Sequence, residues 1–245
     1  MHRFFAPSFT RGDKTVALPR DEAEHLTRVL RLTVGDTIAV FDGRGHESLA
    51  RIVSTGAREV RVQILSRIEP AAEPAVSLTL VQAVLKGEKM DDVVRDAVML
   101  GVTAIQPIVT SRTETSVAAL TKGARPDRWR RIALAAVKQS RRAVLPEIRT
   151  PLRFEAVLEE PPPALTLMLI EPSASAAVEP MSALGEHPPP DAAVLVGPEG
   201  GWTEEECVAA RSAGVRLMTL GRRTLRADAV PVAAISVLQF LWKDL

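Results

Sequence analysis

The sequence predicts an α/β protein of two domains, and two patterns along the chain carry this prediction. From residue 3 to about residue 68, short runs alternate polar and apolar residues with a period of two, which is typical of half-exposed β-strands. From residue 76 onward, apolar runs alternate with amphipathic segments, which is typical of a largely parallel sheet covered by helices. The proline-containing segment EPAAEPA, residues 69–75, lies between the two patterns and predicts a linker.

The first domain, residues 1–70, is predicted to be a small β-barrel with one helix. Its strands include Thr37–Phe41, which ends in the turn pair Asp42–Gly43, and then the alternating segments ESLARIVSTG and REVRVQILSRI. The segment PRDEAEHLTRVLRL interrupts these strands. It predicts a helix because four of its apolar residues share one face: Ala23, Leu26, Val29 and Leu30.

The second domain, residues 76–245, alternates strands and helices. VSLTLVQAV is a nearly continuous apolar run and predicts a strand buried on both faces. KGEKMDDVVRDAVMLGV predicts a helix that stops at Gly101, and RWRRIALAAVKQSRR predicts a second amphipathic helix. Further strands are predicted at AIQPIV, LTLMLIEP, AAVLVG and VRLMTLG, with helices at TEEECVAARSAG and over the last fifteen or so residues.

The composition excludes several classes of protein. The single cysteine, Cys207, permits no intrachain disulfide and no cysteine-based zinc cluster, and is more typical of a packing residue than of a nucleophile. The four histidines are scattered, so no metal site is expected. No apolar segment is long enough for a signal peptide or a spanning helix, so we expect a cytoplasmic protein without membrane association.

The net charge of only +1 hides a strongly basic segment. Residues 120–153 contain ten Lys or Arg against two acids, a local balance of +8. Such concentration favours contact with a phosphate backbone over the alternative, a solvated helix face. The absence of tyrosine and the small number of phenylalanines argue against a base-stacking platform for single strands.

The segment LVGPEGGWTEEE, residues 195–206, predicts a ligand-binding loop, because ligands of parallel sheets bind at the carboxyl ends of strands. Thr203 and Glu206 form a capping-box pattern, so a helix should begin at about Glu204. The acidic first turn and the lack of a G-K-[ST] ending exclude a phosphate ligand. A neutral or cationic ligand, such as an adenosyl sulfonium compound, fits these residues. The alternative is a turn that only links strand to helix, and this alternative would be favoured if the loop were the only motif of its kind in the chain.

This loop and the later LGRRTLRADAVPVAAISVLQ, residues 220–239, together resemble the signature of RsmE-type ribosomal RNA methyltransferases in the SPOUT superfamily. The family pattern is a G-P-E-G-G loop followed by L-G-x-R-x-L-R-x-E-T-A. The resemblance spans almost the whole chain, because it includes RFFAP, HLTRVLRL, VGDTIAVFDGRG, KGEKMDDVVRDAVMLGVTAIQPIVTSRT and RWRRIALAAVKQSRRAVLPEI.

The resemblance implies an amino-terminal PUA-like β-barrel that helps to hold RNA. It also implies a carboxyl-terminal SPOUT α/β domain that is tied in a trefoil knot, binds S-adenosylmethionine and forms a homodimer. The implied reaction is methyl transfer to N3 of one uridine of 16S ribosomal RNA, usually uridine 1498. The substrate would be that RNA either naked or within the small ribosomal subunit.

Carried over by position, three loops would surround the cofactor: residues 170–172, 196–201 and 220–227. The implied cofactor contacts are Ile170, Val196, Gly197, Pro198, Glu199, Gly200, Gly201, Leu220, Gly221, Leu225, Arg226 and Ala227. Arg226 is the implied catalytic or substrate-orienting residue, and Glu171, Glu199 and Asp228 are the carboxylates available as a general base. The implied RNA contacts are Arg3, Arg28, Arg31, Lys86, Lys89, Arg141 and Arg142.

Two alternatives remain open, and one departure from the family pattern supports the first of them. The family's R-x-E-T-A is Arg226-Ala227-Asp228-Ala229-Val230 in this chain, so a shorter acid replaces glutamate and an alanine replaces threonine. The first alternative is a non-catalytic RNA-binding or ribosome-assembly factor. The second is a SPOUT methyltransferase that acts on another RNA, such as transfer RNA.

Overall fold

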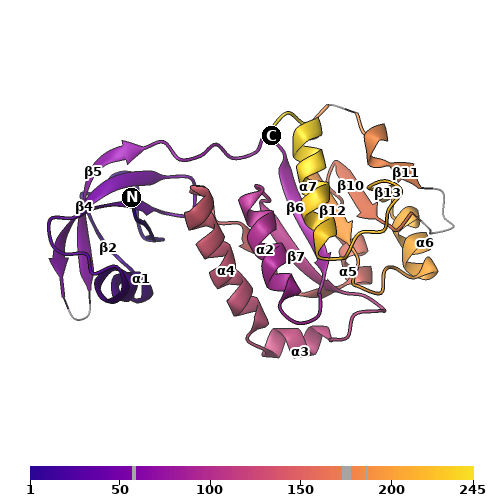
Figure 1. The fold of residues 1–245 in the computed structure, drawn as a ribbon, viewed down its shortest axis with the longest axis horizontal. Coiled ribbons are helices and arrows are strands. Elements are labelled where there is room, and N and C mark those ends of the chain that lie inside the picture. The colour runs from indigo at the N-terminus through magenta and orange to yellow at the C-terminus, as the bar shows by residue number, and fades with distance from the viewer. Residues whose placement is uncertain (57–58, 173–177, 186) are drawn as a thin grey trace. The chain divides into compact units, whose positions relative to one another are not determined.

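The computed structural model (Figure 1) describes residues 1–56, 59–172, 178–185 and 187–245. The chain forms two compact units, of which the first comprises Met1–Glu73 with Leu134–Leu145 and the second comprises Pro74–Ala133 with Pro146–Leu245. The division at Glu73 falls within the predicted linker. The segment Leu134–Leu145 belongs to the first unit, although the sequence assigned it to the second domain, so helix α4 (Arg125–Ser140) contributes to both units.

The first unit is built on a curled, five-stranded sheet in the order β1-β3-β4-β5-β2. The strands β1 and β3 pair in parallel, and the other neighbours are antiparallel. The predicted barrel is therefore a half-barrel in which β1 and β2 form the two edges. The three predicted strands are confirmed as β3 Thr37–Phe41, β4 Glu47–Thr55 and β5 Val60–Ile68. The sequence did not single out the two edge strands, β1 Arg3–Phe5 and β2 Thr15–Ala17.

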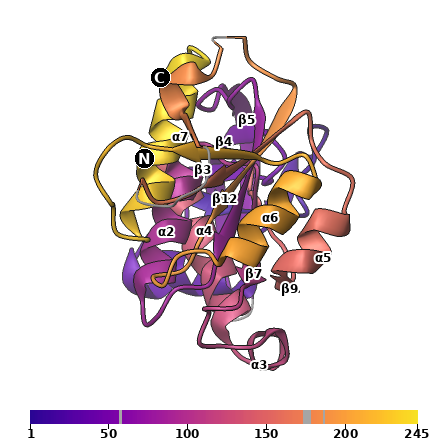
Figure 2. The ribbon, with the colours of Figure 1, turned by 90° about the vertical axis from the view of Figure 1, so that its right-hand side faces the viewer.

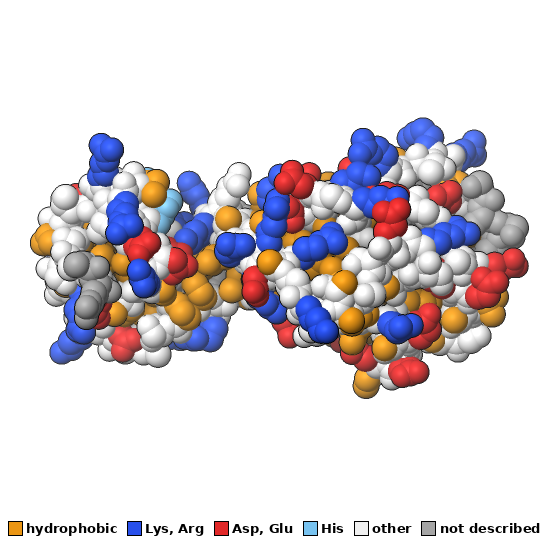
Figure 3. Space-filling model, turned by 90° about the horizontal axis from the view of Figure 1, so that it is seen from below, with side chains coloured by type: hydrophobic (Ala, Val, Ile, Leu, Met, Phe, Trp, Pro, Cys, Tyr) orange, Lys and Arg blue, Asp and Glu red, His pale blue; other side chains and the backbone are white. Residues whose placement is uncertain are grey.

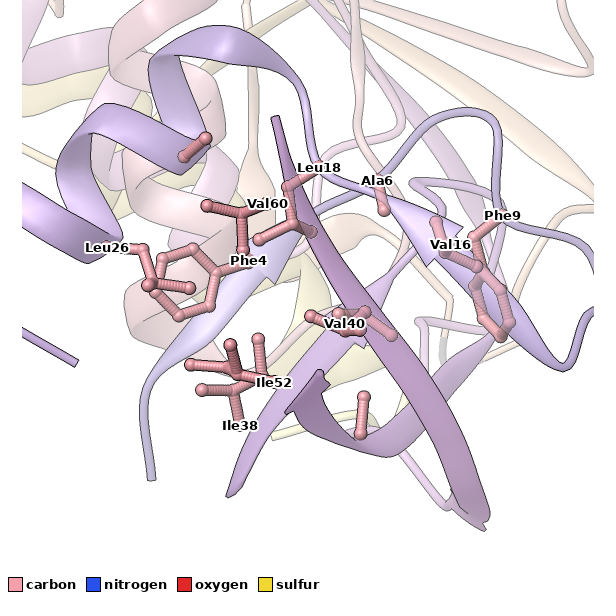
Figure 4. Packing of buried hydrophobic residues seen from close by; sticks show 13 residues of the cluster. Phe4, Ala6, Phe9, Val16, Leu18, Leu26, Ile38, Val40, Ile52 and Val60 are labelled. Atoms are coloured by element: carbon pink, nitrogen blue, oxygen red, sulfur yellow. The ribbon is translucent and has the colours of Figure 1, made fainter. Parts of the chain in front are cut away.

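The core of the first unit lies in the concave face of this sheet. Period-two alternation places Val60 and Val62 in the core, while Arg61 between them is exposed. Figure 4 shows Phe4 of β1 together with Leu26 of the helical segment and Ile52 of β4, and all three side chains are fully buried. Burial of such side chains stabilises a fold by about 1.5–3 kcal/mol each.

The helix predicted in this unit is confirmed, but the prediction that Val29 lies on its buried face is wrong. Helix α1 (Arg20–Glu24) continues directly into a π-helical turn, η1 (His25–Val29), in which Leu30 N donates to His25 O at 3.1 Å. Ala23 and Leu26 are buried as predicted, whereas Val29 is 65% exposed. The reason is geometric, because a π-turn holds more residues than an α-turn and rotates Val29 away from the core face.

The second unit contains a parallel sheet in the order β11-β13-β10-β12-β6-β7-β8, and β9 also pairs with β7. Every ladder in this sheet is parallel, which confirms the predicted α/β arrangement. The bounds are β6 Ser77–Ala83, β7 Ala104–Val109, β8 Glu147–Ile148, β9 Leu152–Arg153, β10 Leu165–Leu169, β11 Glu179–Pro180, β12 Asp191–Val196 and β13 Arg216–Thr219.

Helices cover both faces of this sheet. In Figure 2, α2 (Lys89–Met99) and α7 (Ala229–Leu241) lie on one face, and α5 (Phe154–Glu159) and α6 (Glu204–Ser212) lie on the other. The sequence did not predict α5, nor α3 (Val117–Lys122) or the 3₁₀ turn η2 (Met181–Ala183). Within the described ranges, no helix combines the length and the apolarity needed to span a bilayer.

The helix predicted at KGEKMDDVVRDAVMLGV is confirmed as α2, and its apolar stripe of Met90, Val93, Val94, Ala97 and Val98 is buried. The predicted stop at Gly101 is confirmed as well. Gly101 has a φ of +95°, which favours glycine, and a Cβ added there would lie 2.4 Å from Pro74 Cγ. The chain can turn back toward β7 at this point only because the residue has no side chain.

Candidate active site

A pocket lies where three neighbouring strands of the second unit end. Strands β10, β12 and β13 run parallel, and Leu169 pairs with both Val196 and Met218, so their carboxyl ends meet at one edge of the sheet. The pocket is lined by Leu169, Ile170, Glu171, Pro172, Val196, Gly197, Pro198, Glu199, Gly201, Trp202, Thr219, Leu220, Arg223, Thr224, Leu225, Ala227 and Val230. The edge where parallel strands end is the usual ligand site of such sheets.

The three loops that the sequence singled out are therefore brought together. Most of the residues named there line the pocket, whereas Gly200, Gly221 and Arg226 belong to the same loops but stand outside its lining. The sequence missed the lining residues Leu169, Trp202, Thr219 and Val230, whereas Arg223 and Thr224 lie within the predicted loop 220–227 but were not named as contacts. Trp202 and the basic residues of loop 220–227 could have been named as contacts from the sequence. Trp202 belongs to the motif LVGPEGGWTEEE, and the loop belongs to the motif LGRRTLRADAVPVAAISVLQ.

Gly197 and Trp202 fix the shape of the glycine loop. A Cβ added at Gly197 would lie 3.0 Å from Trp202 Nε1 and 3.1 Å from Trp202 Cε2, so the indole occupies the space that a side chain would need. Trp202 Nε1 donates to Leu169 O at 2.9 Å. Its ring also packs on Phe154, with centroids 5.2 Å apart. Trp202 thus ties the loop to the end of β10.

Helix α6 begins directly after this loop, as predicted. The capping box is complete, because Thr203 Oγ1 accepts from Glu206 N at 3.2 Å and Glu206 Oε2 accepts from Thr203 N at 2.9 Å. The other carboxylate oxygen of the buried Glu206 accepts from Ser111 N at 2.8 Å. The start of α6 is therefore stabilised by its own capping box and by a hydrogen bond from the segment that follows β7.

The carboxylates around the pocket have different environments. Glu199 Oε1 accepts from Lys89 Nζ at 2.9 Å and from Lys86 N at 3.2 Å. Partial burial raises the pKa of Glu199, but the bonds from the Lys89 ammonium and from backbone amides outweigh it and hold the pKa below its ordinary value of 4.5. Asp228 Oδ1 accepts from Arg226 Nε at 3.2 Å, whereas Glu171 has no ion pair within the described part of the chain.

Arg226 stands between two lining residues but does not itself line the pocket. Leu225 and Ala227 line the pocket, while the side chain of Arg226 is 74% exposed and pairs with Asp228. Its guanidinium therefore lies at the surface beside the pocket, where it can contact a large substrate.

Two of the predicted RNA contacts are wrong, because their side chains are buried inside the first unit. Arg3 is 9% exposed, and its guanidinium bonds both oxygens of Glu47 and the carbonyls of Val137, Lys138 and Arg142. Arg142 is 4% exposed and donates to Glu73 at 3.0 Å. A guanidinium that is desolvated and paired in this way holds the fold together instead of facing a phosphate.

The remaining predicted RNA residues are exposed or half-exposed. Arg28, Arg31 and Arg141 of the first unit are exposed and form no ion pair among the described residues. In the second unit, Lys86 pairs with Glu114 at 2.5 Å, and Lys89 pairs with Glu199. These two lysines therefore have acidic partners that the sequence did not reveal.

The basic segment of residues 120–153 is less positive in the fold than along the chain. Acids from elsewhere in each unit neutralise part of it, since Arg128 pairs with Glu88 and Asp91, and Lys138 pairs with Glu22. On the face of the second unit seen in Figure 3, Lys and Arg side chains alternate with Asp and Glu. The segment thus forms mixed ion-pair surfaces instead of one uninterrupted basic face.

Two further sequence predictions concern a metal and a cysteine. The described ranges contain no group of three or more His, Cys, Asp or Glu side chains that could hold a metal ion. Cys207 packs within the core cluster around Ala210 and Leu217, and burial raises the pKa of its thiol. Cys207 is a packing residue, as predicted.

The chain matches two family models. Residues 72–239 match an RNA methyltransferase domain, and residues 18–65 match an RNA methyltransferase PUA domain. The ribosomal RNA small subunit methyltransferase E of Synechocystis sp. is 33% identical over 94% of this chain and 74% of its own length. The chain belongs to the ribosomal RNA small subunit methyltransferase E family. This confirms the predicted RsmE-type methyltransferase, its PUA-like first domain and its methyltransferase second domain.

Two solved methyltransferase structures share the fold of this chain. A ribosomal RNA small subunit methyltransferase E from Neisseria gonorrhoeae, bound to S-adenosylmethionine, is 34% identical with a TM-score of 0.87 and covers 99% of this chain and 98% of its own. A Legionella pneumophila protein in complex with bound S-adenosylmethionine is 30% identical, also with a TM-score of 0.87, and covers 97% of this chain and 96% of its own. The predicted enzyme class is thereby confirmed.

Proposed function

We propose that this chain transfers the methyl group of S-adenosylmethionine to N3 of one uridine in 16S ribosomal RNA, and that the pocket at the ends of β10, β12 and β13 binds the cofactor. One observation carries the proposal. The three loops that resemble the family signature, residues 170–172, 196–201 and 220–227, converge on the same pocket. The N. gonorrhoeae and L. pneumophila relatives were solved with this cofactor bound, which supports the cofactor assignment.

The lining of the pocket fits an adenosyl sulfonium compound. Apolar side chains such as Ile170, Val196 and Leu220 suit a purine ring, and the glycines let the backbone approach a ligand closely. Glu171 lines the pocket without an ion-pair partner among the described residues, and its negative charge favours a cationic sulfonium over a phosphate. The proposed direct contacts are Ile170, Val196, Gly197, Pro198, Glu199, Gly201, Leu220, Leu225 and Ala227, with Gly200 and Gly221 shaping the loops.

When bound, S-adenosylmethionine supplies an electrophilic methyl group on a positively charged sulfur. The protein must hold the uracil ring with N3 facing that methyl group, and this positioning can contribute a large part of the rate. It must also accept the N3 proton. Glu171 is the best placed of the three candidate carboxylates, because it lines the pocket and has no cationic partner in the described residues. Glu199 is held by Lys89, and Asp228 is held by Arg226.

Arg226 is proposed to stabilise the uracil ring as it loses its proton. Loss of the N3 proton places negative charge on O2 and O4, and a fixed guanidinium can stabilise that charge. Arg226 stands beside the pocket with its side chain open to a substrate. Asp228 reaches Arg226 Nε at 3.2 Å, so the shorter acid of this chain still orients the guanidinium where the family has glutamate.

The partner proposed for this chain is 16S ribosomal RNA, naked or within the small ribosomal subunit, in the cytoplasm. RNA contacts are proposed for Arg28, Arg31 and Arg141, which are exposed, and for Lys86 and Lys89 by exchange of their acidic partners. A homodimer through a knotted second domain is also proposed. It is supported by two exposed apolar side chains that lie three positions apart on one face of α7, Val237 and Phe240, which are 37% and 71% exposed.

The experiment is methyl transfer from radiolabelled S-adenosylmethionine to small ribosomal subunits and to naked 16S RNA, both from a strain that lacks this modification. Mass spectrometry then identifies the methylated nucleoside. We expect 3-methyluridine at one position. Methylation of another nucleoside or of transfer RNA would contradict the proposed target. Absence of transfer to any RNA would contradict the enzyme itself and favour a ribosome-assembly factor.

In the same assay, the variant Glu171→Gln tests whether Glu171 acts as the general base or only as a binding residue. We expect kcat to fall about 100-fold, the range for loss of a general base, while the Kd for RNA stays unchanged. Glu159→Gln, an exposed glutamate on α5, is the matched control and should retain wild-type kcat. An unchanged kcat in Glu171→Gln would assign the N3 proton to another acceptor.

A further inference from the structure

The segment that follows β7 forms a tight, self-braced turn. Thr110 N donates to Thr113 Oγ1 at 3.1 Å, the two threonine hydroxyls lie 2.9 Å apart, and Thr113 N donates to Thr110 O at 3.2 Å. These bonds fix the backbone on both sides of Ser111 and Arg112. The turn belongs to the stretch QPIVTSRT, which no part of the reaction described above requires.

Arg112 lies across the glycine loop. Its Nη1 donates to Gly200 O at 2.6 Å, although the two residues are 88 positions apart in the chain. Its aliphatic stem also contacts the loop, because a Cβ added at Gly200 would lie 3.2 Å from Arg112 Cβ and 3.3 Å from Arg112 Cδ. Gly200 therefore has no room for a side chain on the face that Arg112 covers.

The same turn also contacts the start of α6, which follows the glycine loop in the chain. Ser111 N donates to the Glu206 carboxylate at 2.8 Å, so two consecutive residues of the turn contact the glycine loop and the first turn of α6. On the pocket side, the position of a Cβ at Gly201 lies 3.4 Å from Glu171 Oε1 and 3.9 Å from Arg112 Nη1. Arg112 thus supports the loop just behind the lining residues Glu171 and Gly201.

We propose that Arg112 is a positioning residue that holds the glycine loop, residues 196–201, in the conformation that binds the cofactor. This inference rests on the proposed placement of S-adenosylmethionine in the pocket. A charged donor on a backbone carbonyl is among the stronger hydrogen bonds of a protein, and it acts here on a loop whose glycines offer little conformational restraint of their own. Without the bond, the loop would populate other conformations, and the cofactor would have to select the competent one.

The test uses variants that separate the hydrogen bond from the packing. Arg112→Met keeps an aliphatic stem over Gly200 but removes the donor, and Arg112→Lys restores a cationic donor. Arg95→Met is the matched control, since Arg95 is an exposed arginine on α2 that pairs only with Asp92 and Asp96 among the described residues. The readouts are the Kd for S-adenosylmethionine by calorimetry, the Tm of the free protein, and KM and kcat with ribosomal RNA.

We expect Arg112→Met to raise the Kd and the KM for S-adenosylmethionine about 10- to 100-fold, as loss of a charged hydrogen bond implies, with kcat at saturating cofactor near wild type. Arg112→Lys should recover part of the affinity, and Arg95→Met should match the wild type. The Tm of the free protein should change little in all three variants, because Arg112 is exposed.

Three results would overturn the inference. The first is an unchanged Kd for S-adenosylmethionine in Arg112→Met. The second is a loss of RNA affinity with normal cofactor affinity, which would place Arg112 on the RNA-binding surface. The third is a large fall in Tm that Arg112→Lys does not rescue, which would make Arg112 a purely structural residue. Failure of the wild-type protein to bind S-adenosylmethionine would instead contradict the proposed function, so the two failures are distinguishable.

Discussion

Glu199 illustrates how a single side chain of the glycine loop combines two tasks. It lines the pocket, and the same carboxylate accepts bonds from Lys89 and from the backbone of Lys86. These bonds tie the loop to the segment before α2. Because they require the ionised carboxylate, the strength of this tie depends on pH.

The sign of that dependence follows from the lowered pKa of Glu199. The stabilisation is fully present above the ordinary value of 4.5 and is lost as the pH falls through the lower folded value. We expect wild type to be more stable than Glu199→Gln at about pH 6, and the difference to shrink toward about pH 3. Urea unfolding over this range measures it, with Glu159→Gln as the control. A difference that is constant with pH would show that ionisation of Glu199 contributes nothing.

Residues that act through their neighbours were the least predictable from the sequence. The motif identified Gly197 and Glu199, because loops after buried strands are recognisable locally. Arg112 could not be identified, because its partner Gly200 lies 88 positions away. Arg3 and Arg142 were assigned to RNA for the same reason: a sequence gives charges but not the partners that bury them.

The junction between β12 and its loop allows a prediction about an element. In Gly197→Ala, the added methyl group meets the Trp202 indole at 3.0 Å, so the ring must move and weaken its bond to Leu169 O. We expect the free energy of unfolding to fall by about 1–3 kcal/mol, as for other overpacked sites, and cofactor affinity to fall with it. Urea unfolding and calorimetry measure the two effects.

The control for this prediction is Gly12→Ala, because a Cβ at Gly12 meets no atom within 4 Å. That variant should unfold within about 0.5 kcal/mol of wild type. Equal stability of Gly197→Ala and wild type would mean that the indole moves freely, and that Trp202 does not fix the end of β10.

Elements with enough residues to show a period were predictable, and the others were not. The stripe of α2 and the capping box of α6 can be recognised from eleven and nine helical residues with their flanks. Strands β8, β9 and β11 have two residues each, too few for any alternation to be seen. The π-turn of η1 was missed because its apolar spacing also fits an α-helix, and only the placement of Val29 distinguishes the two.

At the scale of the whole molecule, chain order and spatial grouping differ. Residues 134–145 group with the first unit, although they follow sixty residues of the second. Within the first unit, this segment contacts the turn between β3 and β4, since Gly45 N donates to Ala143 O and Leu145 N donates to Gly43 O. A linker rich in proline marks where one unit first ends. No local pattern marks where the chain returns to the first unit, because the grouping of residues 134–145 depends on hydrogen-bond partners nearly one hundred residues away.

The pocket formed by the three loops is proposed to bind S-adenosylmethionine. The most direct test is a crystal structure of the protein with S-adenosylhomocysteine, the demethylated product. We expect density for the ligand between Ile170, Gly197 and Leu225, against the backbone of residues 196–201 and 220–227. Density elsewhere, such as in the cavity at the opposite ends of the strands near Thr166 and Asp191, would contradict it.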